Sequence, residues 1–267
     1  MYLVDYHLHS KYSFDGNHEL CDICETAISR GLSEIAITDH MDIYSNKPYE
    51  HILDCKSLYT ELADIKAKYE GRLKVLIGTE LGQPQANRDE ARKFMEDYSF
   101  DFVIGSIHNM VNDKDAYDYD YTKTDYHEVF DMFLDWTKVL ASDYEYDVLG
   151  HITYPSRYVY EQTRVRVDIS EYLERYEDIL KTVIGRGCGI ELNMSGFARG
   201  SNDAMPGLEL LKMYHDLGGE IITVGSDAHV LDHVGTVTAR GYEMLKEAGF
   251  KYITVFEERK PEFIKIV

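Results

Sequence analysis

Short apolar segments alternate with longer amphipathic ones along the whole chain. The apolar segments span residues 3–9, 34–40, 74–82, 101–108, 147–152, 189–194 and 220–229, and their length and β-branched residues predict strands. The longer segments carry apolar residues at helical spacing and span 19–31, 52–70, 88–97, 125–142, 170–186, 206–218 and 235–248. A strand followed by a helix, repeated in this way, predicts a parallel sheet of the α/β class. Seven such units predict a barrel.

The chain carries no feature that would divide it into separate domains. It has 267 residues, without a Gly/Ser linker, a charge block or a repeat of fixed period, so we expect one domain over 1–267. Two segments are harder to place: the polar, Tyr-rich stretch 114–125 and the tail after 252–256, for which the pattern suggests no partner.

Composition and charge narrow the classes of partner and compartment. The formal net charge is −20, which repels a polyphosphate backbone, so we expect no nucleic-acid partner. No basic segment precedes an apolar one at the N-terminus, and no apolar run reaches the roughly 18 residues that span a bilayer. We therefore expect a soluble cytoplasmic protein without a membrane partner. The sequence leaves its oligomeric state open.

The cysteine pattern agrees with a reducing compartment. Four cysteines in a chain of this length do not make a disulfide scaffold. Cys21 and Cys24 form a CxxC motif, but they lie within a helical pattern and lack a second pair, so we expect them to pack or to face solvent.

Polar side chains gather where the predicted strands end. In parallel barrels the loops at the carboxyl ends build the active site, so these residues are expected to converge there. Imidazole and carboxylate groups at one point form a ligand set for Zn, Mn or Fe. A buried polar network without metal is the alternative, at the cost of desolvating every group in it. The residues are His7, His9, Asp39, His40, Glu80, His108, His151, Asn193, Asp227 and His229.

Six of the eleven histidines fall at these strand ends. We expect the other five to have surface or capping roles, with the role of His233 the least clear because it follows His229 closely. They are His18, His51, His127, His215 and His233.

The motifs HLHS, TDH, GTELG, GSIH, GHI, ELN and GSDAH, in this order and spacing, resemble the PHP (polymerase and histidinol phosphatase) family over essentially the whole chain. The segments ELNMSGFARG and GHITYPSRY resemble most the monofunctional L-histidinol-phosphate phosphatases of that family. The resemblance implies a distorted (β/α)7 TIM-like barrel with three divalent metal ions at the carboxyl ends of its strands. It also implies hydrolysis of a small-molecule phosphomonoester.

The resemblance further implies a ligand set for each ion. The first would be held by His7, His9, Glu80 and Asp227, the second by Glu80, His108 and His151, and the third by His40 and His229. The family pattern completes the third set with a histidine eight positions after His7, and this chain has Asp15 there. A carboxylate still binds metal but is a harder donor, which favours Mn or Fe(II) at that position. The alternative is that Asp15 only fixes the SFDG turn.

Glu80, Asp227 and His229 are the expected catalytic residues, with Asp227 or a water as the proton source for the leaving group. Arg157 and Arg199 follow the fifth and sixth strands and suit bidentate phosphate binding, unless they are surface residues. From their position alone, Asp42, Tyr44 and the loop 117–121 are assigned to a cationic amine and an imidazole ring.

Two other functions remain open. One is a PHP-type phosphatase acting on a phosphotyrosine protein or a nucleotide, which would share the metal ligands and differ in the loops. The other is a non-catalytic metal-binding module, although such a module would be expected to lose ligands and here every position is filled.

Overall fold

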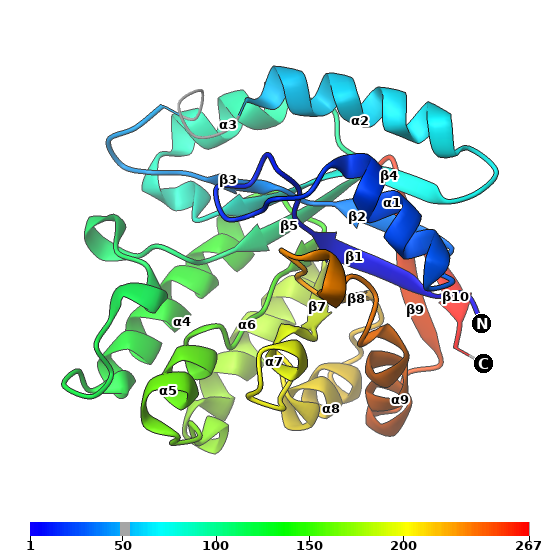
Figure 1. Cartoon of the computed structure of the whole chain (residues 1–267). Coiled ribbons are helices and arrows are strands. Elements are labelled where there is room, and N and C mark those ends of the chain that lie inside the picture. The colour runs from blue at the N-terminus through cyan, green and yellow to red at the C-terminus, as the bar shows by residue number, and fades with distance from the viewer. Residues whose placement is uncertain (49–53, 267) are drawn as a thin grey trace.

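The computed structural model describes residues 1–48 and 54–266 and forms a barrel of parallel strands surrounded by helices (Figure 1). The strands pair in the order β1-β2-β4-β5-β6-β7-β8. The short strand β3 lies outside this series and pairs with the last residues of β4, beyond the part of β4 that pairs with β2. A parallel bridge between Leu8 and Ala228 joins the two ends of this series, so the barrel is nearly closed. The predicted α/β barrel is confirmed. The strands are β1 Val4–Leu8, β2 Glu34–Ile37, β3 His40–Asp42, β4 Lys74–Gly82, β5 Phe102–Ser106, β6 Val148–Leu149, β7 Gly189–Asn193 and β8 Ile222–Gly225.

The helices lie close to the predicted ranges, and polar side chains set several of their starts. Asp54, Asn87 and Asp125 accept backbone N–H groups at the beginnings of α2, α3 and α4. Residues 52 and 53 of the predicted helix 52–70 lie outside the described residues. The helices are α1 Leu20–Ser29, α2 Cys55–Tyr69, α3 Arg88–Asp97, α4 Tyr126–Asp143, α5 Pro155–Thr163, α6 Leu173–Gly185, α7 Ser195–Ala198, α8 Leu208–Asp216 and α9 Thr238–Ala248. Short 3-10 helices are η2 Pro84–Ala86, η3 Val111–Asp113, η4 Ala116–Asp118, η5 Ile169–Tyr172 and η6 Leu231–His233.

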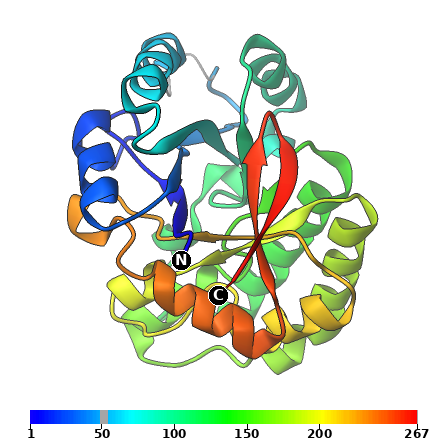
Figure 2. The same ribbon diagram turned by 90° about the vertical axis from the view of Figure 1, so that its right-hand side faces the viewer.

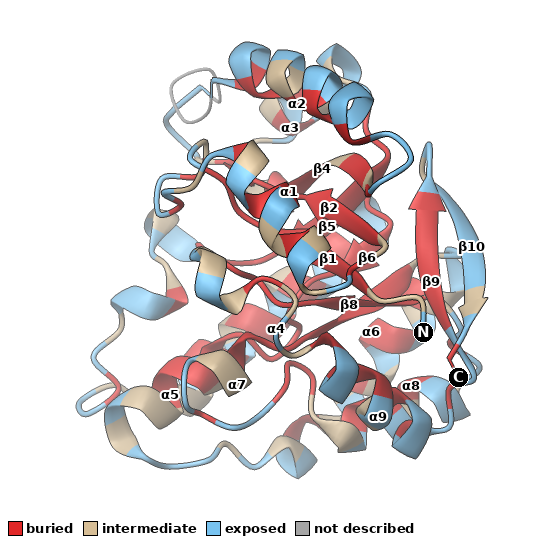
Figure 3. Cartoon of the chain, turned by 45° about the vertical axis from the view of Figure 1, so that its right-hand side comes forward, coloured by how far each residue is buried: buried red, intermediate tan, exposed pale blue. Residues whose placement is uncertain are grey.

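The strands of the barrel, β1 to β8, are buried along nearly their whole length, while the helices expose one face (Figure 3). Helices cover these parallel strands on the outside, and side chains fill the barrel on the inside, so both faces of each strand are buried. This explains why the strands appear in the sequence as continuous apolar runs. None of the described helices is long and apolar enough to cross a membrane.

The tail that the sequence left without a partner forms an antiparallel hairpin of β9 Tyr252–Glu257 and β10 Lys260–Lys265. The hairpin crosses the end of the barrel where the strands begin, in front in Figure 2. Phe256 packs against Tyr6 and Phe102, and its backbone N–H donates to the Tyr6 hydroxyl at 2.8 Å. Ile222, the first residue of β8, donates its N–H to the Thr254 hydroxyl at 3.0 Å. The hairpin therefore closes the amino end of the barrel and leaves the carboxyl end for the polar residues.

Candidate metal centre

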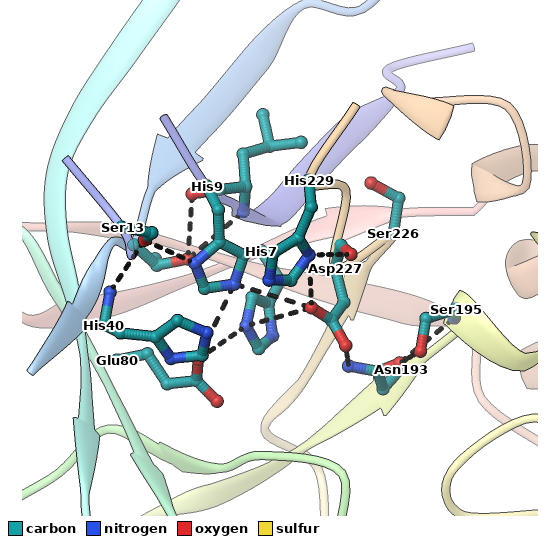
Figure 4. A network of polar contacts seen from close by, with 12 residues as sticks. His7, His9, Ser13, His40, Glu80, Asn193, Ser195, Ser226, Asp227 and His229 are labelled. Atoms are coloured by element: carbon teal, nitrogen blue, oxygen red, sulfur yellow. Dashed lines mark hydrogen bonds and ion pairs between the residues drawn. The ribbon is translucent and has the colours of Figure 1, made fainter. Parts of the chain in front are cut away.

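The residues predicted as metal ligands converge at the carboxyl ends of the strands. His7 lies within β1 and His9 just after it, so both rings point into the barrel, as the two-residue spacing predicts (Figure 4). His40 begins β3, Glu80 lies in β4, and the remaining side chains come from the loops after β1, β5, β6 and β8: Asp15, His108, His151, Asp227 and His229.

Glu80 lies at the middle of this group and is fully buried. Five histidine rings approach its two carboxylate oxygens, and the Ser106 hydroxyl donates to Oε1 at 2.7 Å. The distances from ring nitrogens to Glu80 are 3.2 Å for His7, 3.6 Å for His9, 2.9 Å for His40, 3.1 Å for His108 and 2.7 Å for His151. One carboxylate thus contacts ligand candidates from four separate strands or strand ends.

Two further carboxylates complete the group. Asp227 Oδ1 lies 3.5 Å from His9 Nε2 and 3.9 Å from His7 Nε2. Asp15 reaches back from the loop after β1, with Oδ2 3.0 Å from His229 Nε2 and Oδ1 3.7 Å from His40 Nε2. Backbone hydrogen bonds close the turn that contains Asp15. The carboxylate of Asp15 is not needed for the turn and faces the histidines.

The donor set fits bound cations. Three trios have ligand atoms within 4.8 Å of one another: His9, His40 and His229; His7, His9 and Glu80; and His40, Glu80 and His108. The buried Nε2 atoms of His7, His9 and His229 and Oε2 of Glu80 make no hydrogen bond, although oxygens and nitrogens lie close by. Lone pairs that face one another without a shared hydrogen are expected where a metal ion joins them. The second trio contains three of the four residues of the first implied ligand set, whereas the other two combine residues of different sets. Among the described residues, the predicted ligands outside these trios are Asp15, His151 and Asp227.

The electrostatics favour ionised carboxylates. Burial alone would raise the pKa of the Glu80 carboxyl, but His7, His108 and His40 hold that pKa well below its usual value. Burial together with His229 and His40 holds the pKa of His9 well below its usual value, so His9 is neutral. Burial alone would lower the pKa of His7, but Glu191, Glu80 and Asp227 raise it well above its usual value. Because metals bind carboxylate and neutral imidazole, an ion that binds at His7 must displace a proton, whereas at His9 it need not.

Two of the predicted ligands occupy strained backbone. His151 has φ 25° and Asp227 has φ 52°, the left-handed region that residues other than glycine rarely adopt. Such conformations persist where the surrounding structure enforces them, and they cluster at functional sites.

Asp39, at a strand end in the sequence, supports the site from behind. Its carboxylate accepts the backbone N–H groups of Ser10 and Ser13 and both of their hydroxyls. Ser13 Oγ in turn lies 3.0 Å from His9 Nδ1. Gly16 allows the backbone of this loop to pass close to Ser10, because a Cβ at position 16 would lie 2.0 Å from the Ser10 carbonyl oxygen.

A pocket of about 320 Å³ opens over the cluster. Arg157 and Arg199 both line it, as do Asp42 and Tyr117. Arg157 is buried at 5% exposure, and its guanidinium lies against the Tyr154 and Tyr158 rings, with Nε making no hydrogen bond.

The assignments made from position alone fall partly within the pocket lining and partly outside it, and their substrate contacts stay a prediction. Tyr44 is not part of the pocket lining within the described residues, and of the loop 117–121 only Tyr117 is. Tyr121 turns inward instead and donates its hydroxyl to the Ala116 carbonyl at 2.8 Å. Asp42 does line the pocket, but it also accepts from His108 Nδ1 at 2.9 Å.

The sequence reading missed three carboxylates near the cluster. Glu191 is buried behind His7, and Asp115 and Glu161 line the pocket. A signal for Glu191 existed, because it lies two residues before Asn193 on a strand and therefore shares its face. No sequence signal pointed to the other two, because Asp115 lies in a loop and Glu161 lies in α5, a helix that the pattern did not predict.

Histidines away from the strand ends do not line the pocket. His127 pairs with Asp125 at the start of α4, and His215 packs on Phe250. His18 and His233 are also outside the lining, and His51 lies outside the described residues. The four cysteines, all among the described residues, form no disulfide.

The PHP domain model matches residues 5–195 of this chain. The protein belongs to the PHP family. A probable histidinol-phosphatase from Clostridium acetobutylicum is 30% identical over 96% of this chain and 98% of its own length. The histidinol-phosphatase of Lactococcus lactis is 27% identical over 96% of this chain and 95% of its own length.

A crystal structure of the Lactococcus lactis histidinol phosphate phosphatase, complexed with zinc, L-histidinol and phosphate, superposes with a TM-score of 0.85. It is 28% identical and covers 97% of this chain and 98% of that one. The PHP fold of the two proteins is therefore shared from end to end.

Proposed function

We propose that this PHP protein hydrolyses L-histidinol phosphate to L-histidinol and phosphate and so serves histidine biosynthesis. The observation that carries the proposal is the joint lining of one pocket by the His/Asp/Glu cluster and by two arginines. The shared fold and the full-length similarity to histidinol-phosphatases support the choice of substrate. The whole chain, 1–267, would act as one domain.

We propose that the cluster binds three divalent ions of Zn, Mn or Fe. The first would be held by His7, His9, Glu80 and Asp227, the second by Glu80, His108 and His151, and the third by Asp15, His40 and His229. When bound, these ions supply a water nucleophile of lowered pKa and positive charge for the phosphoryl oxygens.

The protein's own residues position the substrate. Arg157 and Arg199 bind phosphate oxygens, and the unpaired Nε of Arg157 is a donor already desolvated for this contact. The candidates for the leaving-group proton narrow to a water beside Asp227, whose carboxylate lies 3.7 Å from Arg157. Burial alone would raise the pKa of this carboxyl, but His7, His9 and His229 hold that pKa well below its usual value, so Asp227 would orient such a water and not carry the proton itself. Glu80, fully buried at the same pocket, would be a ligand shared by the first two ion sites.

A cationic amine fits the other wall of the pocket. Asp115 and Glu161 line it, and neither has an ion-pair partner among the residues that the structure describes. Glu161 follows Arg157 by four residues in α5, so the two lie on one helix face about one turn, roughly 5 Å, apart. A substrate with a phosphate and an ammonium group separated by a short chain would meet both.

Phosphate release from L-histidinol phosphate, phosphotyrosine and a nucleoside monophosphate, measured with the metal-loaded protein, tests the proposal. We expect kcat/KM for histidinol phosphate to exceed the other two by at least about a hundredfold, because only that substrate carries its ammonium group on the carbon next to the phosphorylated one, close enough to the phosphate to meet Glu161 and Asp115. If kcat/KM for phosphotyrosine or for the nucleotide is equal or higher, histidinol phosphate is not the preferred substrate and the proposal is wrong.

A further inference from the structure

Glu191 of β7 lies behind the cluster and joins three segments of the barrel. It is buried, at 1% exposure. Its Oε1 lies 2.7 Å from Nδ1 of His7, and its Oε2 accepts the backbone N–H of His151 at 3.0 Å. The side-chain amide of Asn193 donates to Oε2 as well, at 3.3 Å. Glu191 thus contacts β1, the turn after β6 and its own strand without facing the pocket.

Strand β8 lies close against Glu191 and His7. A Cβ at Gly225 in β8 would lie 2.4 Å from Glu191 Oε1 and 2.4 Å from the His7 Cβ. Only a glycine lets the neighbouring strand approach this closely. Gly225 therefore leaves the space in which the Glu191 carboxylate meets the His7 ring.

This contact determines where the proton of a neutral His7 ring resides. A carboxylate only accepts hydrogen bonds, so Nδ1 of His7 must be the donor. The lone pair of the neutral ring is then on Nε2, which lies 3.2 Å from Glu80 Oε2 and makes no hydrogen bond. That nitrogen is left free to bind a cation at the place where Glu80 and Asp227 also point.

We propose that Glu191 is a positioning residue that fixes the tautomer and orientation of His7 and thereby sets the affinity of the first metal site. It is not itself a ligand. Its Oε2 also accepts the backbone N–H of His151 and so stabilises the unusual backbone conformation of that residue, which has φ 25°. The inference rests on the metal centre of the proposed function. Carboxylates that orient metal-bound histidines in this way typically contribute 10- to 100-fold in metal affinity.

Replacement by glutamine separates this role from simple packing, because the side chain keeps its size. Glutamine offers one acceptor and one donor, whereas Glu191 accepts at both oxygens. If the amide nitrogen faces His7, the ring must accept at Nδ1 and carry its proton on Nε2, where a metal would bind. If the amide nitrogen faces His151, two N–H donors meet and the strained turn loses its acceptor.

The experiment is a competition titration of Zn²⁺ between the protein and a chelator of known affinity, followed for each bound ion. We expect Glu191→Gln to weaken the binding of one ion by about 10- to 100-fold and to lower the thermal midpoint of the metal-free protein no more than Glu34→Gln does. Glu34→Gln is the matched control. Glu34 is equally buried, but it accepts from Tyr2 and Tyr6 at the other end of the barrel, so its replacement should lower the midpoint and leave zinc affinity unchanged.

A double-mutant cycle with His7→Ala tests whether Glu191 acts through His7. In the His7→Ala protein, Glu191→Gln should cause no further loss of affinity at the first site. If Glu191→Gln does not fold, Glu191→Asp, which keeps the charge but cannot reach both donors, takes its place in the cycle. Unchanged zinc affinity in the Glu191 variant, or a full additional loss in the His7→Ala background, would overturn the inference. A wild-type protein that binds no zinc would instead overturn the proposed function.

Discussion

Asp15→Ala removes the one predicted ligand at which this chain departs from the usual PHP pattern. In the structure its carboxylate lies 3.0 Å from His229 and 3.7 Å from His40, at the open side of the cluster. The side chain of Asp15 is 42% exposed, whereas that of Glu80 is fully buried. Loss of Asp15 should therefore affect the third ion and leave the ions around Glu80 in place.

The exposure of Asp15 sets the magnitude of the effect. A single charge 4 Å from a divalent ion contributes between about 2 kcal/mol in water and about 8 kcal/mol at an effective dielectric of 20. For a carboxylate this exposed we take the lower part of that range, about 3 kcal/mol, which is roughly a hundredfold in affinity.

Metal analysis after dialysis against a buffered concentration of free metal measures this loss. We expect about three ions per wild-type chain and about two per Asp15→Ala chain. Asp15→His is the matched variant: it should retain three ions and shift the third toward zinc, because imidazole is the softer donor. Three ions bound with unchanged affinity in Asp15→Ala would refute the reasoning and leave Asp15 only a role in its turn.

The other predictions concern the whole centre, the pocket walls and the far end of the barrel. Chelation should abolish phosphatase activity, and Zn or Mn should restore it. Because the ions bind only the folded chain, a metal concentration 1,000 times Kd stabilises by about 4 kcal/mol, so calorimetry should show the chelated protein melting at least about 8 °C lower. Glu161→Gln should raise KM for histidinol phosphate about tenfold without changing turnover of a phosphomonoester that lacks an amine, and Asp118→Asn, an exposed carboxylate outside the pocket, should change neither. Arg157→Met and Arg199→Met should raise KM more than they lower kcat if each binds phosphate equally in ground and transition states, and a kcat/KM within twofold of wild type in both would remove them from the site. Phe256→Ala should cost about 3–5 kcal/mol in urea unfolding, because Phe256 is 2% exposed, and should leave metal affinity intact. A loss of metal binding there would mean that the two ends of the barrel are coupled.

Much of the fold followed from the sequence because parallel strands buried on both sides leave a strong apolar signal. The hairpin at the tail did not, because its partners Tyr6, Phe102 and Ile222 are distant in sequence and no local pattern points to them. Helix α5 was also missed, since four of its nine residues are buried and two of these four, Arg157 and Tyr158, line the pocket.

The first layer of the site was predictable because its residues follow strands, and strand ends converge in a barrel. The layer behind it was not. The alternation of β7 puts Glu191 on the face of Asn193, but the roles of Glu191 and Asp115 are recognised only through the atoms they contact, His7 Nδ1 in one case and the backbone N–H of Tyr117 in the other. Side-chain orientation within loops likewise decided that Tyr117 enters the pocket and Tyr121 does not.

Anomalous diffraction from crystals of the metal-loaded protein, recorded at the zinc, manganese and iron edges, tests the central claim most directly. The account predicts three peaks: one between His7, His9, Glu80 and Asp227, one beside His108 and His151, and one between Asp15, His40 and His229. Each peak should lie roughly 2.0–2.2 Å from the imidazole nitrogens and carboxylate oxygens around it, which is the length typical of such metal bonds. An ordered cluster without anomalous peaks, in crystals of protein that releases phosphate from histidinol phosphate at full rate, would contradict it.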